Sequence, residues 1–221
     1  MPSSLDRRTF LGASLGTGLT TSLTASTITP ASTAAPPPTV AAAAGTFSPD
    51  DAKFKYRKAC KFGMTRGQSL SERFQSAKDA GFDGVEMDSP NGMSTLEVVA
   101  AAQEVGIRIP GVVDSVHWQI TLSDPDAAKR EEGRKALETA IRDSHAYGGT
   151  SVLLVPAVCG NSVSEEAAWE RSIGEIRKTL PLAADLGIHV LIENVWNRFL
   201  YNHDGSNNQS AEKFAAYLDA I

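Results

Sequence analysis

The segment HVLIENVWNRF, residues 189–199, joins a short apolar run to a carboxylate, an amide and an aromatic ring. A strand buried in a parallel sheet is typically a short, nearly continuous apolar run, and residues 190–192 form one. Glu193 interrupts this run, and an ionised carboxylate that leaves water needs a cation or several hydrogen-bond donors. Two interpretations stay open. Glu193 either ends the strand and caps a polar structural feature, or it is a metal or proton ligand at the strand's carboxyl end.

Upstream of this segment, the sequence alternates between apolar strands and amphipathic helices. Ser or Asp stands before most of the predicted helices and Gly follows most of them, as expected of N-caps and left-handed C-terminal positions. Strands are predicted at 56–64, 84–88, 107–118, 151–158 and 189–192, and helices at 70–80, 94–104, 124–147, 164–187 and 211–219. Strict alternation predicts parallel strands joined by right-handed crossovers, which is an α/β fold.

Two α/β architectures fit this alternation, a barrel and an open doubly wound sheet. The sequence has no glycine-rich phosphate turn after the first predicted strand, which disfavours a dinucleotide-binding sheet. Polar residues stand near the ends of several strands: Glu86 and Asp88, then His117, then Glu193. Because a barrel builds its site from the ends of many strands, this distribution favours an incomplete (β/α)8 TIM barrel with about five parallel β–α units.

The first 45 residues are expected to lie outside the fold. Residues 6–12 resemble a twin-arginine export signal, since paired arginines precede Phe-Leu and a weakly apolar stretch; a disordered basic N-terminus is the alternative. Residues 24–48 have the Ala, Thr, Ser and Pro composition of a linker. We expect a signal peptide and linker at 1–45, a partial barrel at 46–221, and export to the periplasm or the extracellular space.

Composition narrows the classes of function. The chain has 221 residues, which suffices for one α/β domain, and its formal charge of −5 argues against a nucleic-acid or anionic membrane surface. No stretch is long and apolar enough for a stable transmembrane helix. Cys60 and Cys159 fit no metal-ligand spacing, so we expect small core residues; a disulfide would need an oxidising compartment.

Three segments together resemble the sugar phosphate isomerase/epimerase family. They are FDGVE at 82–86, GGTSVLLVP at 148–156 and IENVWN at 192–197. That family has the xylose isomerase-like TIM-barrel fold. Within it, the segments are most similar to L-xylulose-5-phosphate 3-epimerase-like and other ketose 3-epimerase-like proteins. The resemblance spans roughly residues 54–221.

The resemblance implies a divalent metal, Mn²⁺ or Mg²⁺, held by Glu, Asp, His and Glu at the ends of the fifth to eighth strands. Only the first ligand falls in this sequence, at Glu193. The implied reaction is 3-epimerisation of a ketose. The metal stabilises an enediolate, and two carboxylates on opposite faces, one of them Glu193, act as base and acid.

A closed barrel needs eight β–α units and typically about 250 residues. We therefore expect a C-terminally truncated chain. Whether this chain is active by itself is left open. We also expect that it is marginally stable or that a second chain, as in a homo-oligomer, closes the barrel.

The same resemblance favours a substrate contact for His117, for which a hydrogen-bonded histidine under a loop is the alternative. Glu86 is expected to face the substrate or to form a structural ion pair with a Lys or Arg. Trp196 either forms a wall of the sugar pocket or packs under a loop, and Asn197 is a polar candidate beside it. The expected partner is a sugar or sugar phosphate, with no nucleic acid and no membrane once the signal is removed.

Three other functions stay open. The first is an exported carbohydrate-binding protein that keeps the strand-end surface and lacks the chemistry. The second is a keto-inositol dehydratase of the same family. The third is an endonuclease-like relative that acts on abasic DNA. It would need a histidine-rich zinc site and a basic groove, whereas this sequence is acidic and has four histidines.

Overall fold

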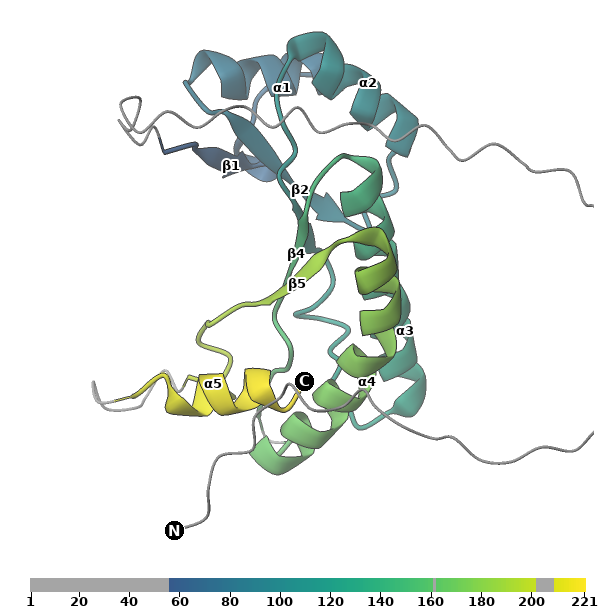
Figure 1. Ribbon diagram of the computed structural model, residues 1–221, viewed down its shortest axis with the longest axis vertical. Helices are drawn as coiled ribbons and strands as arrows, with labels where there is room; N and C mark the ends of the chain where they lie inside the picture. Colours follow the sequence, from purple (N-terminus) through teal and green to yellow (C-terminus); the bar gives the residue numbers. More distant parts are fainter. Residues whose placement is uncertain (1–55, 161, 202–208) are drawn as a thin grey trace, which may run out of the picture. The chain divides into compact units, whose positions relative to one another are not determined.

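The computed structural model describes residues 56–160, 162–201 and 209–221 (Figure 1). The signal and linker predicted within 1–45 lie outside the described residues. The described strands form one parallel sheet in the order β1-β2-β3-β4-β5. They are β1 (Ala59–Lys61), β2 (Gly84–Ser89), β3 (Val112–Asp114), β4 (Ser151–Leu154) and β5 (His189–Ile192). Each strand pairs with the next one in the chain, as in a barrel, so the predicted five-stranded parallel architecture is confirmed.

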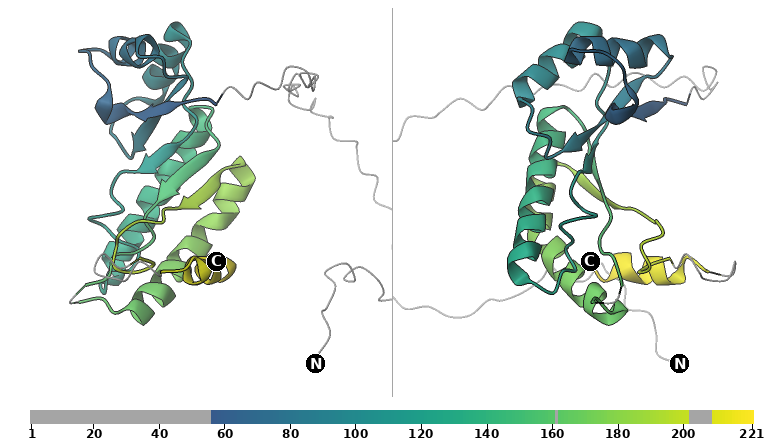
Figure 2. Two further views of the ribbon diagram at one scale, coloured as in Figure 1. Left: turned by 90° about the vertical axis from the view of Figure 1, so that its left-hand side faces the viewer. Right: turned by 180° about the vertical axis from the view of Figure 1, so that it is seen from behind.

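Helices connect these strands, and α1 to α4 lie along one face of the sheet (Figures 1 and 2). They are the 3₁₀ turn η2 (Phe62–Met64) and the helices α1 (Leu70–Asp79), α2 (Thr95–Val105), α3 (Ala127–Ala146), α4 (Glu165–Leu186) and α5 (Glu212–Asp219). None of the described helices combines the length and the apolar character needed to cross a bilayer.

Local capping explains where the helices begin and end. Ser69 forms a capping box with Glu72 at the start of α1. The Ser164 hydroxyl accepts a hydrogen bond from the Ala167 N–H (3.2 Å) at the start of α4. Gly187 ends α4 with a φ of 67°, a left-handed conformation that glycine adopts without a Cβ clash. These signals act within a few residues, so they can be read from the sequence.

Strand lengths were predicted less well. The third strand was expected over 107–118, but β3 covers only three residues. The Asp114 side chain accepts from the Val116 N–H (3.1 Å), and the N–H groups of Gln119 and Ile120 donate to the Val116 carbonyl, so the chain turns there. Residues 62–64 are likewise a 3₁₀ turn rather than strand, and β4 ends at 154 rather than 158. Pro181 lies inside α4 without ending the helix.

Side chains of the sheet alternate between two environments. Five apolar side chains that face the helices are at most 1% exposed: Val85, Met87, Val112, Val152 and Leu154. The residues between them face the other side, where Leu191 is 46% exposed. Alternation of side chains along a strand produces this pattern. The core therefore lies between sheet and helices, and the open face of the sheet is the side available to a ligand.

Both cysteines are free thiols. Cys60 is buried, as predicted, and Cys159 is half-buried and packs against the core. Burial raises the pKa of the Cys60 thiol and raises the pKa of Cys159 to about 11. Neither residue is therefore a reactive thiolate at neutral pH.

Candidate functional site

Glu193 directly follows β5 and lies on the open face of the sheet. Its N–H donates to the Leu154 carbonyl (2.8 Å), which extends the parallel ladder one residue past the end of β5. Because side chains alternate, Glu193 shares a face with the exposed Leu191. Glu193 thus stands, half-buried, at the carboxyl end of a parallel strand, where barrel enzymes place their chemistry. Its role as base or metal ligand stays a prediction.

Glu86 in β2 lies on the same face and pairs with a lysine from the neighbouring strand. Lys61, the last residue of β1, is its partner in the ladder, and the Lys61 Nζ lies 3.6 Å from the Glu86 Oε2. The side chain of Lys61 is 55% exposed and that of Glu86 is 28% exposed. The ion pair considered for Glu86 is therefore present, and both side chains still reach solvent on the open face.

The electrostatics connect β2 with β5 across this face. Burial raises the pKa of Glu86, while the Lys61 ammonium acts in the opposite direction. The negative charges of Asp88 and Glu193 raise the pKa of Glu86 further, because like charges disfavour ionisation. Glu193 is therefore close enough to Glu86 for the two charges to interact. We refer to Lys61, Glu86, Asp88 and Glu193 as the strand-end cluster.

His117 lies in the turn after β3 and is 5% exposed. Its Nδ1 accepts a hydrogen bond from the Val155 N–H (3.0 Å). Burial, together with the positive charge of Lys61, lowers the pKa of His117 to about 4. The imidazole is therefore neutral at pH 7, and because Nδ1 is the acceptor, the proton is on Nε2. A hydrogen-bonded histidine is confirmed, and the predicted substrate contact through Nε2–H stays a prediction.

Asn197 ties the segment after β5 to the segment after β4. It is 1% exposed, and its Nδ2 donates to the Ala157 carbonyl (2.9 Å). Its Oδ1 accepts from the N–H groups of Phe199 (3.2 Å) and Leu200 (3.3 Å). These bonds give Asn197 a structural role, and the predicted sugar contact is untested. Trp196 is 65% exposed, so most of its ring does not pack under a loop.

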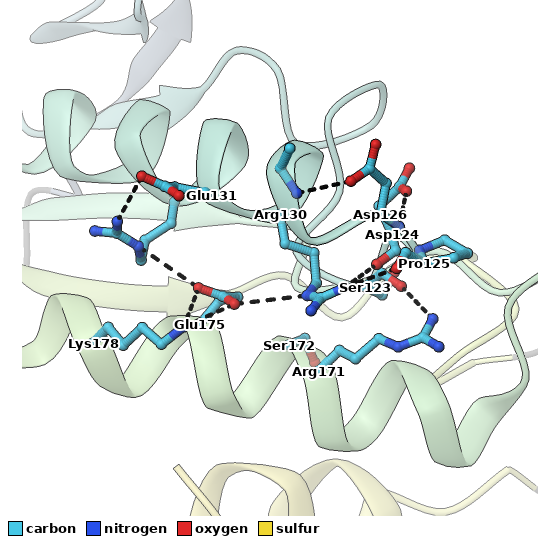
Figure 3. A network of polar contacts seen from close by, with 12 residues as sticks. Ser123, Asp124, Pro125, Asp126, Arg130, Glu131, Arg171, Ser172, Glu175 and Lys178 are labelled. Carbon is cyan, nitrogen blue, oxygen red and sulfur yellow. Dashed lines mark hydrogen bonds and ion pairs between the residues drawn. The ribbon is translucent and has the colours of Figure 1, made fainter.

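A network of ion pairs between α3 and α4 holds the segment that follows His117 (Figure 3). Glu175 of α4 lies 3.7 Å from Arg130 and 3.6 Å from Arg134, both in α3. Arg130 also donates to the backbone carbonyl of Asp124 (2.8 Å), just before α3 begins. The connection from β3 to α3 is therefore linked to α4 through Arg130 and Glu175, and this link restricts the turn that carries the His117 imidazole.

Asp114 is a buried carboxylate at the end of β3. It is 1% exposed and pairs in register with Ser89, so its side chain lies on the helix side of the sheet. Burial raises the pKa of Asp114 to about 6, although the N–H of Val116 donates to its Oδ1. A carboxylic acid that titrates near neutrality is therefore buried at the end of β3, on the helix side of the sheet.

Sequence reasoning singled out neither Lys61 nor Asp114. Both residues end a strand, so the criterion that selected Glu193 would have selected them as well. The predicted strands 56–64 and 107–118 ran past both positions and concealed them. The residues at which β1 and β3 end were the information needed to find Lys61 and Asp114.

The residues of the strand-end cluster do not by themselves form a complete metal site. The described part of the chain contains no group of three or more His, Cys, Asp or Glu side chains that could hold a metal ion. The Lys61 ammonium beside Glu86 also repels a dication, whereas Mg²⁺ requires about six oxygen ligands in octahedral geometry. These residues do not fit a resident metal centre, and we derive no chemical step through one.

A cavity of 510 Å³ lies at the opposite, amino-terminal ends of the strands. Its lining includes Lys58, Gly84, Arg108, Tyr147 and Thr150. Because barrel enzymes carry their chemistry at the carboxyl ends of the strands, this cavity is not the predicted site.

Comparison with known proteins places the chain in a family. Residues 74–221 match the family model described as xylose isomerase-like TIM barrel. L-ribulose-5-phosphate 3-epimerase UlaE of Escherichia coli O1:K1 / APEC is 32% identical over 104 residues, which cover 42% of this chain and 35% of that protein. The match therefore spans about a third of the length of the curated relatives.

Solved structures agree on the fold. The 3-keto-D-glucoside 4-epimerase YcjR from E. coli has a TM-score of 0.59 at 20% identity, covering 75% of this chain and 66% of that one. A D-allulose 3-epimerase from Methylomonas sp. in complex with D-allulose has a TM-score of 0.55 at 18% identity, covering 74% and 58%. At these identities the likeness shows the fold alone. With the family match extending over most of its length, this chain belongs to the xylose isomerase-like TIM barrel family.

Proposed function

We propose that this chain is an isomerase-type protein that epimerises a ketose, free or phosphorylated, at the carbon beside its carbonyl group. The observation that carries the proposal is the strand-end cluster, in which the charges of Glu86 and Glu193 interact across the open face. The substrate class is supported by relatives named L-ribulose-5-phosphate 3-epimerase and by structural neighbours named ketose 3-epimerases. The chain covers only part of the length of each of these proteins, so its activity is part of the proposal.

Epimerisation requires a base that removes a proton from carbon and an acid that returns one on the other face. We assign the base to the Glu193 carboxylate, which is half-buried and faces the open side of the sheet. When the C–H bond breaks, its electron pair forms the double bond of the enediolate and the proton passes to Glu193. We assign the binding of sugar hydroxyl groups to Glu86 and to the Nε2–H of His117.

One further element of the proposal rests on the sequence. Export by the twin-arginine route is proposed from the paired arginines in residues 6–12. Export also makes a free sugar the more natural substrate.

The test is deuterium exchange. The full chain is incubated in D₂O with D-allulose or L-ribulose 5-phosphate, with and without Mn²⁺, and NMR follows the proton beside the carbonyl. We expect exchange by the wild type and a loss of about 100-fold or more in Glu193→Gln, since general-base catalysis typically contributes about 10²–10⁴-fold. Glu132→Gln, an exposed change on α3, is the control and should leave the rate unchanged.

Two results would reject the proposal. Equal exchange by Glu193→Gln and the wild type would remove Glu193 from the mechanism. Sugar binding by the wild type without exchange would favour the carbohydrate-binding alternative.

A further inference from the structure

We infer that Lys61 binds the oxygen of the substrate that becomes negatively charged, an inference that rests on the proposed function and assigns one more residue to that site. Lys61 ends β1 and reaches the open face on which Glu86 and Glu193 lie. The ligand that we expect at Lys61 is a polyhydroxy ketone. A stable sugar anion with a planar carboxylate in place of the ketone should bind there as well.

The position of Lys61 follows from the alternation of β1. Cys60 is buried on the helix side, so the next residue points to the opposite face. The Nζ–Oε2 distance of 3.6 Å to Glu86 is longer than a hydrogen bond of about 2.7–3.2 Å. An ammonium group has three N–H donors, so two remain for a ligand even when one is directed at Glu86.

Charge explains why the site needs this residue. An anionic intermediate beside Glu193 would lie near the carboxylates of Glu86 and Asp88, which repel it, while Glu193 is neutral because it has taken the proton. Within the described residues, Lys61 is the cation whose charge acts on Glu86 and also on His117. A preorganised cation aimed at the position where charge develops is a common means of stabilising such an intermediate.

A purely structural role explains less. The backbone ladder already joins β1 to β2 over three residue pairs. An ion pair whose lysine is 55% exposed adds little to stability. The ammonium is better explained as a group that remains accessible for a ligand oxygen.

The step balances with solvent water as the proton donor on the opposite face of the carbon. As Glu193 takes the proton from carbon, the C–H electron pair becomes the carbon–carbon double bond and the carbonyl π electrons move to oxygen. Lys61 Nζ–H then donates to this oxygen and keeps its own proton. When water gives a proton to the opposite face of the carbon, the electrons move back and the oxygen leaves the ammonium as a neutral carbonyl. The hydroxide that remains takes the proton from Glu193 and restores its carboxylate.

Binding of L-xylonate tests the inference independently of turnover, because the planar carboxylate of this aldonate carries the charge that the enediolate oxygen would carry. Isothermal titration calorimetry of the full chain in metal-free buffer compares four proteins: wild type, Lys61→Met, Lys61→Arg and Lys58→Met. Lys58 lies near the amino end of β1, beside the 510 Å³ cavity, and is the matched control. Circular dichroism confirms that each variant is folded.

We expect Lys61→Met to weaken L-xylonate binding at least tenfold, Lys61→Arg to weaken it less than threefold, and Lys58→Met to leave it within twofold. Neutral D-allulose should bind to Lys61→Met within threefold of the wild type. Equal L-xylonate affinity in the wild type and Lys61→Met overturns the inference, as does a wild type that does not bind this anion or a loss confined to Lys58→Met.

The two proposals fail separately. Exchange that depends on Glu193, combined with anion binding that ignores Lys61, refutes the present inference alone. Anion binding that depends on Lys61, without any exchange by the wild type, leaves an anion site and refutes the proposed epimerase.

Discussion

Replacing His117 by asparagine measures the free energy associated with one buried, neutral imidazole. The Nδ1 of His117 accepts from the Val155 N–H, and an asparagine Oδ1 is an acceptor that can take its place. Asparagine does not titrate. The variant therefore keeps a hydrogen-bond acceptor in the turn and removes the protonation equilibrium.

The magnitude follows from the two protonation equilibria. The pKa of His117 falls from 6.5 to about 4 in the folded chain, because burial and the Lys61 charge disfavour the imidazolium. The unfolded chain therefore binds the proton more tightly than the folded chain does. As the pH falls from about 6.5 toward about 4, protonation favours the unfolded chain, so the folded chain loses stability that it has in full above pH about 6.5. At about 1.36 kcal/mol per pKa unit, the loss is about 3 kcal/mol.

Urea unfolding followed by circular dichroism between pH 8 and pH 4 tests this value. Relative to the wild type, His117→Asn should gain about 3 kcal/mol of unfolding free energy as the pH falls through this range. Gln119→Asn, an exposed change in the same turn, should show a difference that does not vary with pH. A pH-independent difference for His117→Asn, or a relative loss at acidic pH, would refute the reasoning.

Three other substitutions test the rest of the structure. Burial raises the pKa of Asp114 from 3.8 to about 6, so ionisation of its side chain destabilises the folded chain as the pH rises through this window. Relative to the wild type, Asp114→Asn should therefore gain up to about 3 kcal/mol of unfolding free energy between pH 4 and pH 7 in the same urea assay. The absence of any gain would contradict the assignment. Glu175→Gln should lower the unfolding free energy by about 1–3 kcal/mol, because Arg130 and Arg134 are about one-fifth exposed and lose a shared partner. Thermal unfolding in 1 M salt should show a smaller loss, since salt screens the ion pairs. A loss that does not depend on salt would argue against ion pairing. Asn197→Ala should cost about 2–3 kcal/mol and increase amide hydrogen exchange at 199–200, whereas unchanged exchange there would show that its side chain does not hold the loop.

The sequence alone determined the order and type of the elements. Strand–helix alternation, the cap at Ser69 and the glycine at 187 are signals that act over a few neighbouring residues, so they can be read without the fold. The placement of Glu193 at the end of the fifth strand was readable for the same reason. Strand ends were less accessible: the Asp114 side chain stops β3 through a bond to Val116, and an apolar run does not reveal that competition.

The tertiary structure alone decided how the strand-end residues act on one another. Lys61, Glu86 and Glu193 come from three different strands, and their interaction depends on the register of the sheet. The neutral state of His117 depends on burial and on a backbone N–H 38 residues away. Electrostatic interaction depends on distance in space and on the exclusion of water, and neither quantity is set by separation along the chain.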